Sequence, residues 1–198
     1  MGDERRDTKE RLIDAALEVL KSDGYVGTSA RAIARAGGLN QALVFYHFGS
    51  VNGLLLTALD RTSEQRLARY REAVSEASSL EDLLDVATRV YREDLEAGHM
   101  TVVSEMIAGS MAHPELKREI VARLEPWIEL AQDAIGRALG SSPFREALPE
   151  RPLAYGLVAF YTGLNMLANL DPDSTEIEAL LEAGSTLAPF ASAILQTG

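Results

Sequence analysis

The fold of this chain is decided by residues 40–47, which read NQALVFYH. The stretch follows Gly37-Gly38 and is closed by Phe48-Gly49, so residues that tolerate positive φ lie on both sides of it. We predict one short helix here, which is too short to be stable without tertiary packing. Its outward face carries an amide, aromatic rings and an imidazole, but no acid. Such a face suits the floor of a DNA major groove, where base edges are exposed.

A second short helix precedes this one. Thr28 and Ser29 are favourable N-cap residues for a helix over Ala30 to Ala36. Gly38 supplies a positive φ at the turn, and Asn40 caps the next helix through its side-chain oxygen. Two short helices joined by a glycine turn form a helix-turn-helix.

Helical periodicity covers nearly the whole chain, and strand alternation is absent from it. We therefore predict an all-α fold of about nine helices, with a three-helix helix-turn-helix domain over residues 1–50 and a helical ligand-binding and dimerisation domain over residues 51–198. The first helix should run from Asp7 to Ser22 and end at Gly24 in a left-handed cap. After the helix-turn-helix, the expected helices are 51–75, 80–96, 101–111, 114–139, 152–170 and 174–196. Pro189 should kink or end the last of these.

The distribution of charge reconciles an acidic protein with DNA. The net charge is −11, but residues 1–50 sum to zero, and no acid occurs between Gly24 and Leu59. An acid-free face on an acidic body can still approach phosphates, although long-range steering is weak.

Composition also points to a location. The chain has no cysteine and opens without a signal-sequence pattern, so we expect a cytoplasmic protein. The uncharged segment 153–170 is long enough to span a membrane, but its polar residues favour a buried helix packed on other helices.

Several residues around the helix-turn-helix recur at a characteristic spacing. They are Gly24-Tyr25, Thr28-Ser29, Ile33-Ala34, Gly37-Gly38-Leu39-Asn40, Ala42, Val44-Phe45, His47-Phe48 and Leu54. As a set they resemble the DNA-binding segment of the TetR family of transcriptional regulators. Three positions depart from the family pattern: Phe45 replaces a tyrosine that often reaches a phosphate, Val51 replaces a lysine, and Asn52 replaces an acid. Tyr46 could supply the missing hydroxyl.

The DNA-contacting residues divide by role, because phosphate contacts set position and base contacts set sequence. Phosphate candidates are Ser29, Tyr46 and His47, together with the first-turn amides of the second and third helices. Base candidates are Arg31, Gln41, Ala42 and Leu43; Asn40 and Phe45 complete the predicted interface. Arg5, Arg6 and Lys9 form either a DNA-binding arm or, as their acidic neighbours favour, a disordered tail. Val44 and Phe48 are expected to be core, His47 is alternatively a packing histidine, and Arg35 is either solvated or a phosphate ligand.

The second half of the chain predicts a ligand pocket. Candidate lining residues, apolar or aromatic with a few polar groups, are Tyr70, Tyr91, Met106, Trp127, Tyr161 and Asn165. The same spacing is also typical of ordinary core. The family resemblance implies a small-molecule effector that tilts the helix-turn-helix and releases DNA.

The last two helices predict a homodimer, because two recognition helices must lie about 34–36 Å apart to enter successive major grooves. They offer small and apolar residues for a four-helix bundle: Gly156, Ala159, Gly163, Leu180, Leu181, Gly184, Leu187, Ala188, Ala191 and Leu195. The alternative is that both helices pack within one monomer.

Catalytic signals are weak. Glu96-Ala97-Gly98-His99 matches half of a di-iron motif, but no second copy exists and Gly98 is better explained as a helix C-cap. We therefore expect no enzyme, no metal site and no cofactor. The predicted function is a ligand-responsive repressor released from a palindromic operator. The alternative is a helical small-molecule binder or enzyme on the same fold that has lost DNA affinity.

Overall fold

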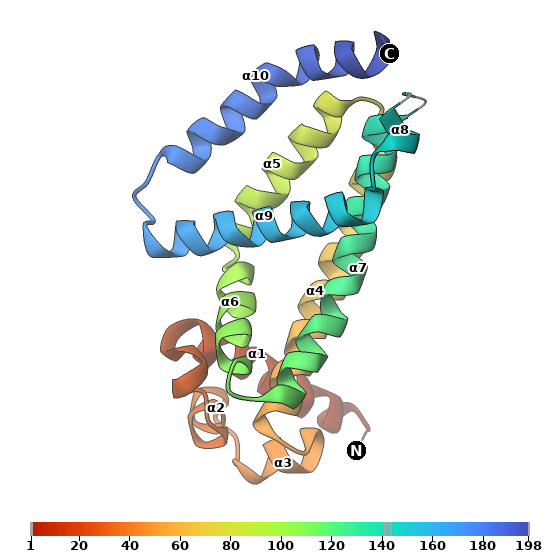
Figure 1. Cartoon of the computed structure of the whole chain (residues 1–198). Helices are drawn as coiled ribbons and strands as arrows, with labels where there is room; N and C mark the ends of the chain where they lie inside the picture. The colour runs from red at the N-terminus through yellow and green to blue at the C-terminus, as the bar shows by residue number, and fades with distance from the viewer. Residues whose placement is uncertain (1, 141, 143, 198) are drawn as a thin grey trace. The chain divides into compact units, whose positions relative to one another are not determined.

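The computed structural model describes residues 2–140, 142 and 144–197, and every regular element in those ranges is an α-helix (Figure 1). The all-α prediction is confirmed. The helices are α1 (Gly2–Gly27), α2 (Ala30–Gly37), α3 (Ala42–Phe48), α4 (Val51–Glu76), α5 (Leu80–Glu96), α6 (His99–Ser110), α7 (Pro114–Leu139), α8 (Phe144–Ala147), α9 (Glu150–Leu170) and α10 (Glu176–Thr197). The four-residue α8 was not predicted.

The first helix differs from its prediction at both ends. It begins at Gly2, so the expected disordered tail is wrong; opposite charges four residues apart, such as the ion pair between Asp7 and Arg11, support a helix here. Gly24 interrupts the helix as predicted, but its φ of 69° comes with a ψ of 179°. This is an extended conformation open to glycine, not the expected left-handed cap.

Pro189 does not end the last helix, which continues to Thr197. Proline removes one helical hydrogen bond, but the ten or more helical residues before Pro189 keep the helix continuous through it. Gly98 has a positive φ of 64° directly after α5, which confirms the C-cap interpretation of that glycine.

The chain forms two compact units. The first comprises residues 1–64 and 101–123, and the second comprises residues 65–100 and 124–198. The predicted domain boundary at residue 50 does not coincide with this division, because the start of α4, most of α6 and the start of α7 share a core with the helix-turn-helix. Fully buried members of that core include Leu12, Ile33, Val44, Leu54 and Met106.

The second unit has two smaller apolar clusters. One joins α5, α9 and α10 through Tyr91, Leu164 and Ile177. The other joins α7 to α9 through Ile128, Ala131 and Ala154. Ion pairing between Arg92 and Glu178 further fixes α10 along α5.

Helix α9 leaves most of its apolar surface uncovered. Only 17% of its most apolar 18-residue window is buried, so this chain alone does not supply the helix packing that the sequence predicts for it. Among the described residues α9 passes a length and composition test for a membrane span, as does the bent pair α3 and α4 if it is counted as one broken span. One or two such helices are weak support for a membrane protein, because core helices of soluble proteins pass the same test.

Candidate functional site

The helix-turn-helix forms through the local bonds that the sequence predicts. Ser29 is the N-cap of α2, and its Oγ accepts from the backbone N–H of Ala32 at 3.2 Å. Gly38 ends α2 in the left-handed conformation, with φ 62° and ψ 37°. Arg11 donates to the Gly37 carbonyl at 3.0 Å, which ties the end of α2 to α1.

Helix α3 separates a core face from an outward face. Val44 is fully buried, and Phe48 packs against the same core, as predicted. Phe45 and Tyr46 lie outward, with 54% and 63% of their surface exposed. The Asn40 Oδ1 accepts from the Ala42 N–H at 2.9 Å, so this side chain caps the helix as predicted and presents its amide nitrogen for other contacts.

The other predicted DNA residues are distributed over both faces. Ser29, Arg31, Gln41 and Ala42 are exposed. Leu43 is half-buried and packs against the core, so only part of its side chain is open to a base. The half-buried imidazole of His47 lies edge-on to the Tyr46 ring, with centroids 4.8 Å apart.

The departures from the family pattern have structural roles of their own. Val51 packs against the core beneath α3 and α4. Asn52 accepts a hydrogen bond from the Tyr25 hydroxyl at 2.9 Å, and the Tyr25 N–H donates to Glu105 at 2.8 Å. Val51 and Asn52 therefore attach the start of α4 to the core and to Tyr25. In the family pattern these two positions carry charged groups.

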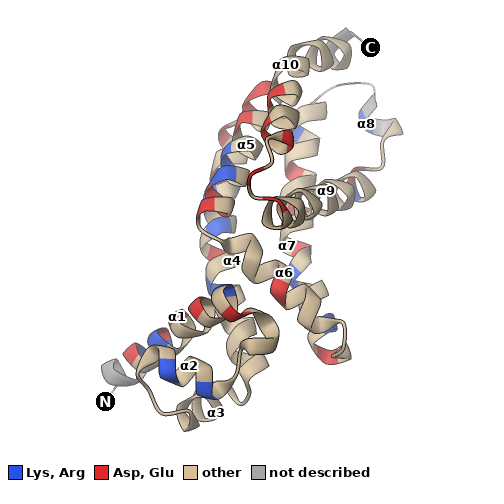
Figure 2. Cartoon of the chain, turned by 90° about the vertical axis from the view of Figure 1, so that its left-hand side faces the viewer, with Lys and Arg blue, Asp and Glu red and all other residues tan. Residues whose placement is uncertain are grey.

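Charge is segregated within the first unit. Figure 2 shows residues of both charge signs on α1 and only Lys and Arg among the charged residues of α2, while α3 carries no Lys, Arg, Asp or Glu. The acid-free stretch before Asp60 thus combines a neutral α3 with two cations, Arg31 and Arg35, on α2. Phosphates meet no fixed negative charge on α2 or α3, whose N-terminal amides also favour anions.

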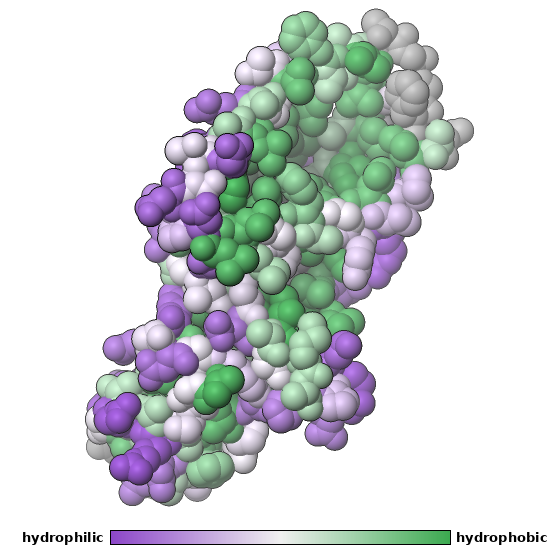
Figure 3. Space-filling model, turned by 60° about the vertical axis from the view of Figure 1, so that its left-hand side comes forward, coloured by the Kyte–Doolittle hydropathy of each residue, from purple (hydrophilic) through white to green (hydrophobic). Residues whose placement is uncertain are grey.

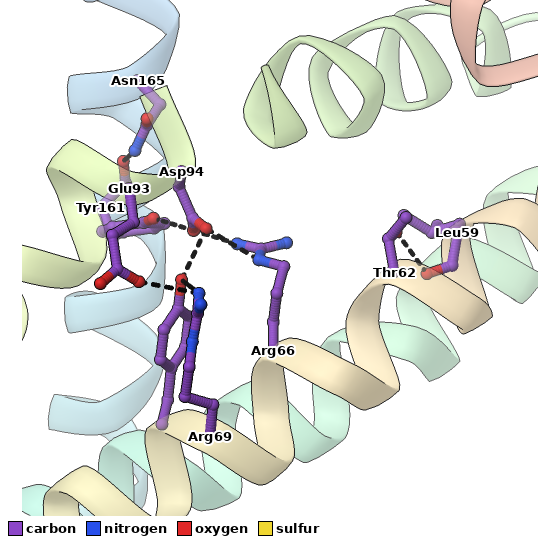
Figure 4. A network of polar contacts seen from close by, with 9 residues as sticks. Leu59, Thr62, Arg66, Arg69, Glu93, Asp94, Tyr161 and Asn165 are labelled. Carbon is purple, nitrogen blue, oxygen red and sulfur yellow. Dashed lines mark hydrogen bonds and ion pairs between the residues drawn. The ribbon is translucent and has the colours of Figure 1, made fainter. Parts of the chain in front are cut away.

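A buried ionic network forms the polar centre of the second unit (Figure 4). Arg66 on α4 and Asp94 on α5 are 5% and 0% exposed, and they pair through two hydrogen bonds, of which the Nε bond measures 2.8 Å. Asp94 also accepts from the hydroxyls of Tyr70, at 2.8 Å, and Tyr161. The carboxylate therefore receives four donors, which is how a buried charge is tolerated.

Aromatic rings surround the same guanidinium. The Arg66 Cζ lies 4.7 Å from the centroid of the Trp127 ring, and the ring centroids of Tyr70 and Trp127 are 6.3 Å apart. Arg69 donates to the Tyr70 hydroxyl at 3.1 Å and pairs with Glu93 at 2.7 Å. The four charged side chains are two cations and two anions, so the network is electrically balanced.

The surroundings keep the tyrosines neutral. Burial, followed by the negative charge of Asp94, raises the pKa of the Tyr161 phenol far above its ordinary value. Burial and the hydrogen bond to Asp94 raise the pKa of Tyr70 as well. Both hydroxyls therefore act as donors to Asp94 at neutral pH.

Asn165 has an unsatisfied acceptor. Its side chain is fully buried, and its Nδ2 donates to the Tyr161 carbonyl at 2.9 Å. Its Oδ1 has no hydrogen-bond partner among the described residues. A buried acceptor of this kind is uncommon and marks a place where a donor fits.

The structure brings together most of the predicted ligand residues. Tyr70, Trp127, Tyr161 and Asn165 belong to or adjoin the network, and Tyr91 packs with Tyr161. Met106 does not join them, because it is fully buried in the core of the first unit.

The charged half of the network was missed. Helical spacing places Asp94 on one stripe with Leu83 and Tyr91, and all three are buried. Arg66 lies four residues before Tyr70 on another helix. Two opposite charges at positions that the helical pattern assigns to the core would have predicted this ion pair.

Comparisons with known proteins agree with this architecture. Residues 12–58 match the family model described as bacterial regulatory proteins, tetR family. The chain is 24% identical over 166 residues to the HTH-type transcriptional regulator UidR of Escherichia coli strain K12, covering 80% of this chain and 84% of UidR. It is 20% identical over 148 residues to the fatty acid metabolism regulator protein of Bacillus subtilis, covering 75% and 76%.

Two solved structures share the fold. FadR from Bacillus subtilis in complex with stearoyl-CoA superposes with a TM-score of 0.74 at 17% identity, covering 90% of this chain and 96% of FadR. GusR from Salmonella enterica superposes with a TM-score of 0.73 at 21% identity, covering 96% of both chains.

Proposed function

Because the chain belongs to the TetR family of ligand-responsive, DNA-binding transcriptional regulators, we propose that it is a repressor released from a palindromic operator by a small apolar or amphipathic effector. Regulators of this family bind DNA operators and small-molecule effectors. We propose a regulatory role without catalysis and a cytoplasmic location, since the relatives compared above are transcription regulators.

The observation that carries the DNA-binding role is the neutral outward face of α3 beside Arg31. Gln41 and Ala42 lie at its exposed start, where an amide can read adenine and a methyl can pack on thymine. The proposed interface comprises Ser29, Arg31, Asn40, Gln41, Ala42, Leu43, Phe45, Tyr46 and His47. Selection of bound sequences from random duplex DNA should yield a palindrome, and recovery of no preferred sequence at low salt would refute the role.

The proposed effector site is the ionic network and its aromatic neighbours. Tyr70, Tyr91 and Asn165 are buried in this structure, and together with Trp127 and Tyr161 they combine apolar rings with placed polar groups, which is the usual character of ligand sites. The unsatisfied Oδ1 of Asn165 favours an effector that donates a hydrogen bond. Screening should therefore identify compounds that dissolve the operator complex, and Asn165→Leu should lower their potency.

The proposed dimer interface uses α9 and α10. Both helices expose large apolar side chains, among them Phe160, Leu167, Leu187, Phe190 and Ile194. Figure 3 shows apolar residues gathering on one face of the second unit. A Cβ added at Gly156, Gly163 or Gly184 would meet nothing within 4 Å, so another helix can approach closely there. Leu181 and Ala188, also predicted for the interface, instead pack within the monomer.

Analytical ultracentrifugation tests this interface. The double variant Leu187→Asp/Phe190→Asp should sediment as a monomer, because the charges would be buried in the bundle. Val121→Asp changes a similarly exposed apolar residue of α7 and should leave the dimer intact. A dimeric double variant would contradict the assignment.

A second candidate function is a small-molecule binder with little DNA affinity. The observation that favours it is the loss of two phosphate-contacting groups, since Val51 and Phe45 stand where the family has lysine and tyrosine. Salt dependence separates the two functions, because each phosphate contact adds to the slope of affinity against salt.

A further inference from the structure

The side-chain oxygen of Asn165 is the buried atom of the second unit that most clearly lacks a partner. Asn165 is fully buried on α9, and its Nδ2 donates to the Tyr161 carbonyl at 2.9 Å. Because a carbonyl can only accept, the amide nitrogen must face it, and the oxygen is the atom without a partner among the described residues. Burying an unsatisfied acceptor costs free energy that an apolar residue at this position would avoid. The asparagine is therefore explained by a molecule that supplies the missing donor.

The residues that flank Asn165 along α9 belong to an apolar cluster. Leu164 and Ala168 pack there with the rings of Tyr91 and Tyr161. Figure 4 shows Asn165 next to Tyr161, whose hydroxyl also donates to the ionic network. A molecule that reaches the Asn165 oxygen therefore meets aromatic rings and aliphatic side chains, and it needs an apolar body to match them.

The charges of the network are already satisfied. Asp94 accepts two hydrogen bonds from the Arg66 guanidinium and two from tyrosine hydroxyls, and a carboxylate has about four lone-pair sites. Arg66 is the matching cation, and the second ion pair of the network is balanced as well. An ionised ligand would therefore be buried without a counter-ion, which costs far more than burying a neutral group.

We propose that the effector is an uncharged apolar molecule with one hydrogen-bond donor, a hydroxyl or an N–H, that binds the Oδ1 of Asn165. The assignment rests on the proposed function, whose effector class it specifies. Asn165 selects for the donor, and the closed Arg66–Asp94 pair selects against ions. A phenol is the simplest member of this class, because its ring suits the apolar cluster and its hydroxyl is uncharged at neutral pH, like that of tyrosine.

The test is isothermal titration calorimetry of the full chain without DNA, using four probes with the same apolar body. They are para-propylphenol, para-propylanisole, para-propylbenzoate and para-propylbenzylamine. The phenol should bind about tenfold more tightly than the anisole, because methylation removes the donor and leaves the ring unchanged. The anionic benzoate and the cationic benzylamine should bind more weakly than either.

Matched variants identify the residue that recognises the donor. In Asn165→Leu the phenol should lose its tenfold advantage and bind about as tightly as the anisole, because the acceptor is absent. The thermal midpoint of this variant should stay close to that of the parent protein, since the substitution removes an unsatisfied buried acceptor. Asn169→Leu is the control: Asn169 is an exposed asparagine one turn further along α9, and its loss should leave the tenfold advantage intact.

Four results would overturn the proposal: no binding of the phenol, equal affinity for phenol and anisole in the parent protein, a tenfold advantage that survives in Asn165→Leu, or a charged probe that binds as tightly as the phenol. Equal losses for both neutral probes in Asn165→Leu, together with a lower thermal midpoint, would also overturn it by assigning Asn165 a structural role. The comparison of probes in the parent protein does not depend on the folding of any variant. Failure of operator selection would instead refute the regulatory role and leave these affinities intact.

Discussion

Replacing Asp94 by asparagine should be among the most destabilising substitutions in the second unit. Arg66 is 5% exposed, so the variant leaves a buried guanidinium cation without its counter-ion. Breaking a buried pair by removing one partner costs about 3–5 kcal/mol. Asparagine keeps an oxygen for the Tyr70 hydroxyl, so we expect the lower end of this range.

Urea unfolding at one fixed protein concentration measures the effect, because the stability of a dimer would depend on concentration. The matched control is Glu178→Gln, which breaks the exposed Arg92–Glu178 pair and should cost less than about 1 kcal/mol. Adding Arg66→Met to Asp94→Asn removes the orphaned charge and should recover stability. A cost for Asp94→Asn no larger than that of the control, or simple additivity in the double variant, would refute the reasoning.

Four further substitutions have outcomes that the sequence and structure predict. Gln41→Ala should lose about 1–3 kcal/mol of discrimination at one base pair in anisotropy titrations. Tyr46→Phe should weaken binding to all duplexes alike, and a loss confined to one base pair would contradict its proposed phosphate contact. Burial and Asp94 raise the pKa of Tyr161, so the unfolded chain ionises first and stability falls as pH rises above about 10. Tyr161→Phe should flatten that slope in urea titrations by up to about 1.4 kcal/mol per pH unit. Gly109→Ala would place a Cβ 2.3 Å from the Tyr25 Cγ, so it should destabilise the protein by about 1–3 kcal/mol in the same assay; unchanged stability would contradict that contact.

The sequence predicted the parts of the fold that depend on local bonds. The caps at Ser29 and Asn40 and the positive φ of Gly38 follow from which residues satisfy orphan helix amides or tolerate a left-handed turn. The role of Met106 could not be predicted, because an apolar residue at helical spacing carries no information about which helix it meets. The pairing of Arg66 with Asp94 is a contact between residues 28 apart. It was visible only as two charges at core positions.

The scarcity of cations near α3 constrains how this protein can hold DNA. Within the acid-free stretch each protomer has only Arg31 and Arg35 to displace counterions, so a dimer offers four such groups. At about 0.9 per neutralised phosphate, these four groups contribute roughly −4 to the slope of log affinity against log salt. This contribution is modest, so we expect the base contacts proposed for α3 to supply much of the affinity. One short helix reads only a few base pairs, so specific binding would need the proposed second copy, paired through the apolar faces of α9 and α10.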